Sequence, residues 1–332
     1  MWKTDSIEVE VETLAVWRIN NSGGNGSLID KVRQSRGKGE PVPVYDIPNI
    51  DEAVTAIRDS LKDSIAVFGD YDCDGICGAL ILKKVLRDAG ADVTVRLPTR
   101  DEGYGINPEH IKEFHDKGIK TVITVDTGVT ATEAAEVAKS FGMKFIVTDH
   151  HEPKDVLPDC IVVDPKLRKE GFREYSGSGV AYILGEKLLK SIGVQMDPDL
   201  ISLASLATVV DMVPLTGPNF DMAREGLLRM RESRSVGIQA LMDISGIQKL
   251  NGNAFGWQLG PRINAAGRMG DPMLALRLLE SEDTGEAAIL ASSLDKINRE
   301  RQGLIAKAVE ECMSEYDDSM FPVFTCDYPS GI

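Results

Sequence analysis

The sequence predicts an α/β fold built on a parallel, doubly wound sheet, followed by a helical region. Three observations indicate this class. Short apolar runs alternate with segments of helical periodicity from about residue 50 to residue 164. The apolar runs are continuous, which is typical of parallel strands that are covered by helices on both faces. From about residue 176 onward the pattern becomes mainly helical.

The individual elements follow in order along the chain. A helical segment at 50–61 precedes the apolar run "SIAVFG", and the segment 76–90 has helical periodicity and ends on Gly90, as a C-cap glycine would. Further strands are predicted at 91–97, 121–126, 144–149 and 160–164, with a helix at 130–142. A long amphipathic pattern at 285–316 indicates a connecting helix.

This order suggests a division of the chain into five parts. They are an N-terminal extension (1–44), an α/β core (45–215), a helical part of the same domain (216–284), the connecting helix (285–316) and the start of a truncated C-terminal domain (317–332). No internal repeat or low-complexity tract interrupts them.

Composition limits the function classes. The formal net charge of −15 argues against binding of nucleic acid through bulk electrostatics, so any such substrate must be held by local positive charge. The sequence has no apolar run of membrane-spanning length and no signal-peptide pattern, so we expect a cytoplasmic protein. Five scattered cysteines fit a reducing compartment, and Cys73 and Cys77, four residues apart, are expected to fill space in the core.

Acidic and imidazole side chains follow three of the predicted strands. Asp70, Asp72 and Asp74 come after the first strand, Asp126 follows the strand at 121–125, and "DHH" (149–151) follows the strand at 144–148. In an open parallel sheet, ligands bind outside the carboxyl ends of the strands. Carboxylates crowded there stay ionised together only if cations neutralise them, and these ligand types suit Mn²⁺ or Mg²⁺. The sequence therefore predicts a site for divalent cations, two in number.

Each motif alone has a simpler explanation. A D-x-D pattern after a strand is often a turn or a helix N-terminus, and Asp126 before Thr-Gly could be an N-cap. The occurrence of all three motifs at equivalent topological positions favours the metal site.

The motifs also resemble those of a known family. "GDYDCDG", "VDTG" and "VTDHH" are similar to the successive motifs of the DHH phosphoesterase superfamily. "LPTRDEGYGIN", "SGSGVAYIL", "LATVVDMVPL", "GPRINAAGRMGDP" and "NRERQ" resemble, within it, the RecJ-like single-strand nucleases, including archaeal members associated with the GINS replication complex. The resemblance covers residues 45 to 320.

The resemblance implies a set of roles at the cation site. Asp126 matches a ligand that bridges two Mn²⁺ or Mg²⁺ ions, His151 matches the histidine assigned to the scissile phosphate, and Asp149 is expected to orient its neighbours. Phe68 stands where many superfamily members have a histidine ligand, and Asp70 is expected to fill that vacancy. The matched ligands are Asp72, Asp74, Asp126, His150 and Asp211.

Substrate contacts are expected from local donors. Guanidinium and amide groups suit phosphate recognition, and "SGSG" before a helix could cradle a phosphate on free N–H groups. The simpler explanation is a helix N-terminus with salt bridges. The predicted substrate-binding residues are Arg100, Arg262, Asn264, Arg268, Ser178 and Gly179. Tyr104 could stack on a base, and Arg301 is expected to tie the long helix to the sheet domain.

The sequence therefore predicts a metal-dependent exonuclease that hydrolyses single-stranded DNA or RNA by two-metal catalysis, in replication or repair. The alternatives are a replication-fork scaffold that partners GINS or a helicase, and a phosphoesterase acting on oligonucleotides or cyclic dinucleotides. Retention of the ligand set favours catalysis over the scaffold. Family members normally carry a C-terminal DHHA1-type domain, whose glycine- and histidine-rich signature does not occur in this sequence.

Overall fold

The computed structural model describes residues 6–10, 16–20, 47–314, 316, 328 and 331. Near the N-terminus, β1 (Ser6–Glu10) and β2 (Val16–Asn20) form an antiparallel pair. The predicted start of a C-terminal domain at 317–332 falls almost wholly outside the described residues. The proposed division into five parts stays a prediction.

The predicted parallel sheet is confirmed. It has five strands in the order β4-β3-β5-β6-β7, and every neighbouring pair is parallel. The strands are β3 (Ser64–Gly69), β4 (Asp92–Arg96), β5 (Thr121–Val125), β6 (Lys144–Thr148) and β7 (Ile161–Val163). The chain leaves β3 for β4 on one side and returns to β5 on the other. The carboxyl ends of β3 and β5 therefore lie at a topological switch point, where α/β sheets bind their ligands.

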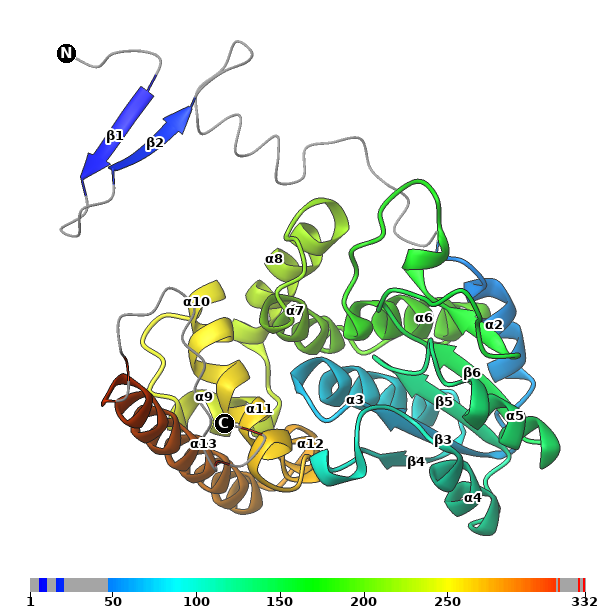
Figure 1. The fold of residues 1–332 in the computed structure, drawn as a ribbon. Coiled ribbons are helices and arrows are strands. Elements are labelled where there is room, and N and C mark those ends of the chain that lie inside the picture. The colour runs from blue at the N-terminus through cyan, green and yellow to red at the C-terminus, as the bar shows by residue number, and fades with distance from the viewer. Residues whose placement is uncertain are drawn as a thin grey trace.

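Helices cover both faces of this sheet (Figure 1). One face packs against α2 (Ile50–Arg58), α3 (Cys73–Asp88) and α6 (Gly177–Ser191), and the other against α4 (Pro108–Asp116) and α5 (Thr132–Ser140). Within β3, Ile65 and Val67 belong to the first core and Ala66 and Phe68 to the second. Both faces being buried explains why the strands read as continuous apolar runs.

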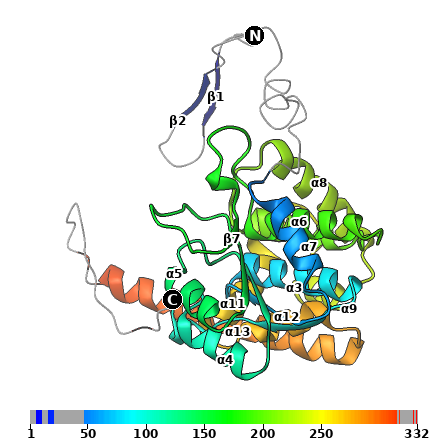
Figure 2. The ribbon, with the colours of Figure 1, turned by 90° about the vertical axis from the view of Figure 1, so that its right-hand side faces the viewer.

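The remaining helices lie beside the sheet unit, where α11 packs on α13 and α12 on α3 (Figures 1 and 2). The predicted long helix is present as α13. A π-helical segment, η3 (Phe255–Leu259), leads directly into α11, and two single-turn 3₁₀ helices are η1 (Arg100–Glu102) and η2 (Pro165–Leu167). The helices are α7 (Leu200–Val210), α8 (Gly217–Glu232), α9 (Val236–Ile244), α10 (Gly252–Ala254), α11 (Gly260–Met269), α12 (Met273–Glu280) and α13 (Thr284–Ser314).

No helix in the described ranges has the length and apolar character needed to cross a bilayer. Cys73 and Cys77 are buried in the core, with sulfur atoms 4.0 Å apart, as expected for space-filling residues.

Candidate metal centre

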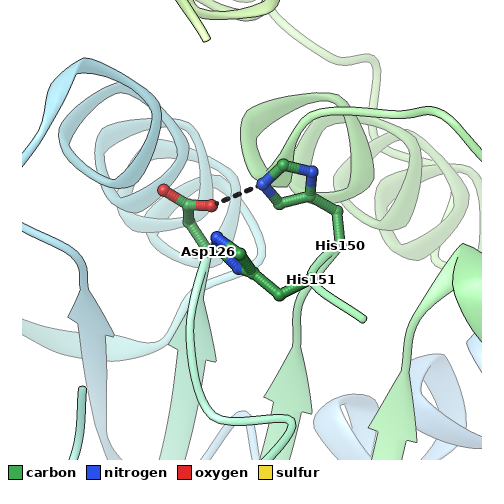
Figure 3. Close-up of side chains that lie close together, drawn as sticks. All are labelled: Asp126, His150 and His151. Carbon is green, nitrogen blue, oxygen red and sulfur yellow. Dashed lines mark ion pairs between the residues drawn. The ribbon is translucent and has the colours of Figure 1, made fainter. Parts of the chain in front are cut away.

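Four chain segments bring acidic and imidazole side chains to one place. Asp70 follows β3, and Asp126 follows β5 directly. The pair His150 and His151 comes from the loop after β6, and Figure 3 shows both imidazoles next to the Asp126 carboxylate. Asp211 is the C-cap residue of α7. The convergence expected from the strand ends is therefore present.

The local sequence explains how the first of these segments turns. The Asp72 side chain accepts hydrogen bonds from the backbone N–H groups of Asp74 and Gly75, at 2.9 and 3.1 Å, and so caps α3. A side chain at Gly75 would place its Cβ 2.4 Å from the backbone of Asp70. The loop can therefore fold back tightly only because position 75 is glycine.

The distances place ligand atoms in three overlapping groups. His150 Nε2 lies 3.0 Å from Asp126 Oδ1 and 3.7 Å from the nearest carboxylate oxygens of Asp74 and Asp211. Asp126 also groups with Asp70 and Asp72, and within each group the ligand atoms lie within 4.8 Å of one another. Asp126 and His150 each belong to two groups. The three groups are Asp70, Asp72 and Asp126; Asp74, His150 and Asp211; and Asp126, His150 and His151.

Unpartnered polar atoms test whether these residues fit a cation. Asp70 Oδ1, Asp126 Oδ1 and His150 Nε2 are all buried and make no hydrogen bond. Buried polar atoms are nearly always hydrogen-bonded, and three exceptions in one cluster require a cause. Carboxylate oxygens and a neutral imidazole nitrogen each offer a lone pair, so the donor set fits hard or borderline divalent cations.

Electrostatics lead to the same conclusion. Burial, reinforced by the neighbouring carboxylates, raises the pKa of Asp70 to about 7 and that of Asp211 to about 8. The same causes raise the pKa of Asp126 well above its ordinary value. Without a cation, some of these groups therefore hold protons near neutral pH. A bound divalent cation would favour their ionised forms.

Asp126 is also held in an uncommon backbone conformation. Its φ is +62°, in the left-handed region that aspartate and asparagine tolerate better than most residues. A Cβ at Gly177 would lie 2.5 Å from the Asp126 Cβ, so the start of α6 packs directly against it. Such strained residues cluster at functional sites, where the surrounding structure fixes them.

Asp149 makes hydrogen bonds to both histidines. Its Oδ1 accepts hydrogen bonds from the backbone N–H groups of His150 and His151 at 2.7 and 3.2 Å, and lies 2.8 Å from His151 Nδ1. Its Oδ2 accepts from Val129 N at 2.8 Å. The bond to Asp149 is the main cause that raises the pKa of His151 to about 9. His151 thus carries a proton at neutral pH, which suits a donor to a phosphate better than a metal ligand.

The prediction that Ser178 and Gly179 cradle a substrate phosphate needs correction. The N–H groups of Gly177 and Ser178 donate to the two carboxylate oxygens of Asp74, at 2.6 and 2.8 Å, and Gly179 N donates to Ser176 Oγ. The start of α6 does bind an anion, but that anion is a side chain of the protein. The "SGSG" turn therefore fixes a candidate ligand of the metal centre.

Two further predicted substrate contacts are also occupied within the protein. The Arg262 guanidinium bonds Asp295 of α13 at 2.8–2.9 Å and the Gln258 carbonyl at 2.7 Å. Asn264 Oδ1 accepts from Cys73 N at 2.7 Å. Arg262 thus forms a salt bridge within the protein, which was the simpler explanation for it. Asn264 ties α11 to the start of α3. A Cβ at Gly267 would lie 2.1 Å from the Tyr71 carbonyl oxygen, so α11 supports the aspartate loop.

The other two predicted substrate residues are differently placed. Arg268 is exposed on α11, and the Arg100 guanidinium lies over the Tyr71 ring, 5.1 Å from its centroid. Arg301 of α13 has its Nε buried without a hydrogen bond, and burial, then the charge of Arg268, lowers the pKa of Arg301. Within the described residues, neither Arg268 nor Arg301 has an ion-pair partner.

Glu102 is a structural residue that sequence reasoning missed. Its Oε2 accepts from the backbone N–H and hydroxyl of Thr99, at 2.6 and 3.0 Å, which closes a capping box around η1. Its Oε1 bonds Arg96. Although burial acts in the opposite direction, these bonds lower the pKa of Glu102 to about 2. This carboxylate anchors the loop that carries Arg100 and Tyr104. The T-x-x-E spacing of 99–102 could have indicated it.

The position of Phe68 is explained by the second core. Its ring is fully buried and packs on His110 and Phe114, at centroid distances of 4.8 and 6.4 Å. The side chain therefore belongs to the second core and supplies no ligand atom to the metal centre. Asp70, two residues after Phe68, has a buried carboxylate oxygen, Oδ1, that makes no hydrogen bond.

Comparisons with known proteins agree with this geometry. Residues 64–208 match the family model described as "DHH family, N-terminal domain". The chain is 37% identical to the single-stranded-DNA-specific exonuclease RecJ of Bacillus subtilis over 81% of its length, and 32% identical to that of Escherichia coli over 89%. It spans only 35% and 55% of the lengths of these two relatives. A solved structure described as exonuclease RecJ bound to manganese superposes with a TM-score of 0.79 at 34% identity, covering 83% of this chain and 72% of that one.

Proposed function

The chain belongs to the RecJ family of DHH proteins, and we propose that it is a divalent-metal-dependent phosphodiesterase. We propose further that it acts as an exonuclease that releases nucleotides from single-stranded DNA or RNA. The relatives named for single-stranded DNA are longer than this chain, so their activity and substrate enter here as support for the proposal.

One observation carries the proposal. Oxygen and nitrogen ligand atoms from three strand ends and α7, several of them buried, converge within a few ångströms, and three of the buried ones make no hydrogen bond. Two cations of the Mn²⁺ or Mg²⁺ type, when bound, would lower the pKa of a water nucleophile and stabilise charge on the attacked phosphate. The proposed ligands are Asp70, Asp72 and Asp126 for one ion, and Asp74, His150 and Asp211 for the other, with Asp126 placed to serve both.

The side chains around the centre have complementary roles. His151, protonated and locked through Nδ1 onto Asp149, would donate from Nε2 to a non-bridging phosphate oxygen. Asp149 is a positioning residue, because its oxygens are occupied by four donors from the two histidines and Val129. Asp72 uses one oxygen to cap α3 and keeps the other for a cation.

Positive charge beside the centre would hold the strand. The Arg100 guanidinium lies over the ring of Tyr71, which stands between Asp70 and Asp72 in the sequence. Arg268 directly follows Gly267, which packs against the Tyr71 carbonyl. The exposed charge of Arg268 next to Arg301 favours a phosphate there, because two guanidiniums near each other repel unless an anion lies between them. These contacts are local, as the net charge of −15 requires.

The same cluster favours catalysis over a scaffold role. A structural subunit gains nothing from several buried carboxylates that repel one another, and removal of their charge would stabilise such a subunit. Retention of all of them at the switch point of the sheet is what a cation-dependent hydrolase requires.

The test is cleavage of end-labelled single-stranded DNA and RNA in the presence of Mn²⁺. We expect mononucleotides from one end, loss of activity on chelation, and at least a hundredfold loss in Asp126→Asn. Asp116→Asn, at a carboxylate that is 83% exposed on α4, is the matched control and should be fully active. Manganese-dependent cleavage that survives Asp126→Asn would show that the activity does not come from this site.

A further inference from the structure

A cavity of about 240 Å³ lies next to the candidate metal centre, between the loop after η1 and the start of α5. Its polar lining comes from Tyr104, Asn107, Thr127, Thr130, Thr132 and Glu133. Thr127 directly follows Asp126, and the Tyr104 hydroxyl lies 3.4 Å from the ring nitrogens of His151. The cavity and the centre therefore share two walls.

The charge of the lining disfavours a phosphate as occupant. Glu133 is the one charged side chain among the described residues that line the cavity. A carboxylate repels a phosphate. Whatever enters beside the scissile phosphate must therefore be a neutral part of the substrate.

The lining fits a planar heterocycle with hydrogen-bonding edges. Tyr104 is 60% exposed, which leaves its ring available for stacking. The threonine hydroxyls both donate and accept, and Glu133 accepts. The N-cap residue of α5 is Ala131, which has no side chain able to cap, so N–H groups of the first turn have no side-chain cap.

We propose that this cavity binds the nucleobase of the nucleotide whose phosphate is cleaved. The proposal rests on the proposed function, and it adds a contact to the base where the metal centre provides only contacts to phosphate. Stacking and edge contacts of this kind are tolerant of sequence, since every base has a π-face. The site would favour nucleotides over other phosphodiesters without selecting one base strongly.

The experiment compares two ligands that differ only in the base. Binding of thymidine 5′-monophosphate and of 2-deoxyribose 5-phosphate is measured by titration calorimetry in buffer with Mn²⁺. We expect the nucleotide to bind about tenfold more tightly or better, in line with stacking on one aromatic side chain. Ala131→Leu fills the cavity. Neither an alanine nor a leucine side chain can accept a capping hydrogen bond, so the change adds volume alone.

Ala131→Leu should abolish the preference for the nucleotide and leave the sugar phosphate unaffected. Ala288→Leu, in a separate cavity of about 370 Å³ between α9 and α13, is the matched control and should keep the preference. Tyr104→Ala removes a side chain that is 60% exposed, and should lower the affinity for the nucleotide about tenfold. This second variant keeps the test decisive if Ala131→Leu fails to fold.

The outcomes separate this inference from the proposed function. Equal affinities for both ligands, in a protein that cleaves oligonucleotides with Mn²⁺, would overturn the base pocket alone. A preference for the nucleotide that persists in both variants would overturn it as well. A protein that neither cleaves nor binds either ligand would overturn the pocket and the proposed function together.

Discussion

Asp126→Asn should make the metal-free protein more stable than the wild type. Two unit charges 4.8 Å apart repel by about 3 kcal/mol at an effective dielectric constant of about 20, and Asp126 lies within this distance of the ligand atoms of Asp70 and Asp72. Protonation relieves part of the repulsion, because burial and the neighbouring charges raise the pKa of these groups. Asparagine has the same shape and tolerates the left-handed backbone that Asp126 adopts. We therefore expect a gain of about 1–3 kcal/mol near pH 8.

Thermal unfolding with and without Mn²⁺ measures this effect. In the metal-free state Asp126→Asn should raise Tm by roughly 2–4 °C for each kcal/mol gained. With free Mn²⁺ at about 100 times its Kd, the wild type should gain about 2.7 kcal/mol, whereas the variant should gain far less. Asp116→Asn should match the wild type in both conditions. A metal-free variant less stable than the wild type, or one stabilised by Mn²⁺ to the same extent, would show that Asp126 is neither a source of repulsion nor a ligand.

Three other predictions follow from the same contacts. Metal-free wild type should lose stability as pH rises from about 4 to about 8, because over this range Asp70 and Asp211 hold protons in the folded state that the unfolded chain, with pKa values of 3.8, has released. Mn²⁺ should remove this slope in Tm against pH. Gly267→Ala should weaken Mn²⁺ binding measured by calorimetry and lower the free energy of unfolding by about 1–3 kcal/mol, because its Cβ would press on the Tyr71 carbonyl. Gly303→Ala, in open space on α13, should do neither. Equal effects of the two changes would contradict the support role of α11. Glu102→Ala should raise KM for oligonucleotides several-fold with little change in kcat, because the loop that carries Arg100 and Tyr104 loses its anchor. Glu109→Ala, at a side chain that is 74% exposed, is the control. An unchanged KM in Glu102→Ala would refute the anchoring role.

The sheet was predictable because its signal is local. Each strand is a continuous apolar run with both faces buried, and the order of strands and helices fixes where the carboxyl ends lie. Helix α4 was missed, because only His110, Ile111 and Phe114 of its nine residues are buried and the rest is polar. Its capping box, formed by Asn107 and His110, was the available signal.

The candidate ligands could also be predicted from local signals, whereas the occupied state of Ser178, Arg262 and Asn264 could not. Asp70, Asp126 and His150 follow strands, so topology alone brings them together. The partners of Ser178, Arg262 and Asn264 lie 33 to 191 residues away in the chain. A donor group in a sequence shows what it can bind, but only packing decides which acceptor reaches it. Asp211, at the end of α7, was found through the family resemblance and not through any local pattern.

We infer that paired cations offset the repulsion among the crowded carboxylates at the switch point. Anomalous diffraction at the manganese edge, from crystals grown with Mn²⁺, would locate these cations. We predict two peaks, one against Asp70, Asp72 and Asp126 and one against Asp74, His150 and Asp211, with Asp126 between them. Crystals saturated with Mn²⁺ that show no peak among these side chains would contradict it.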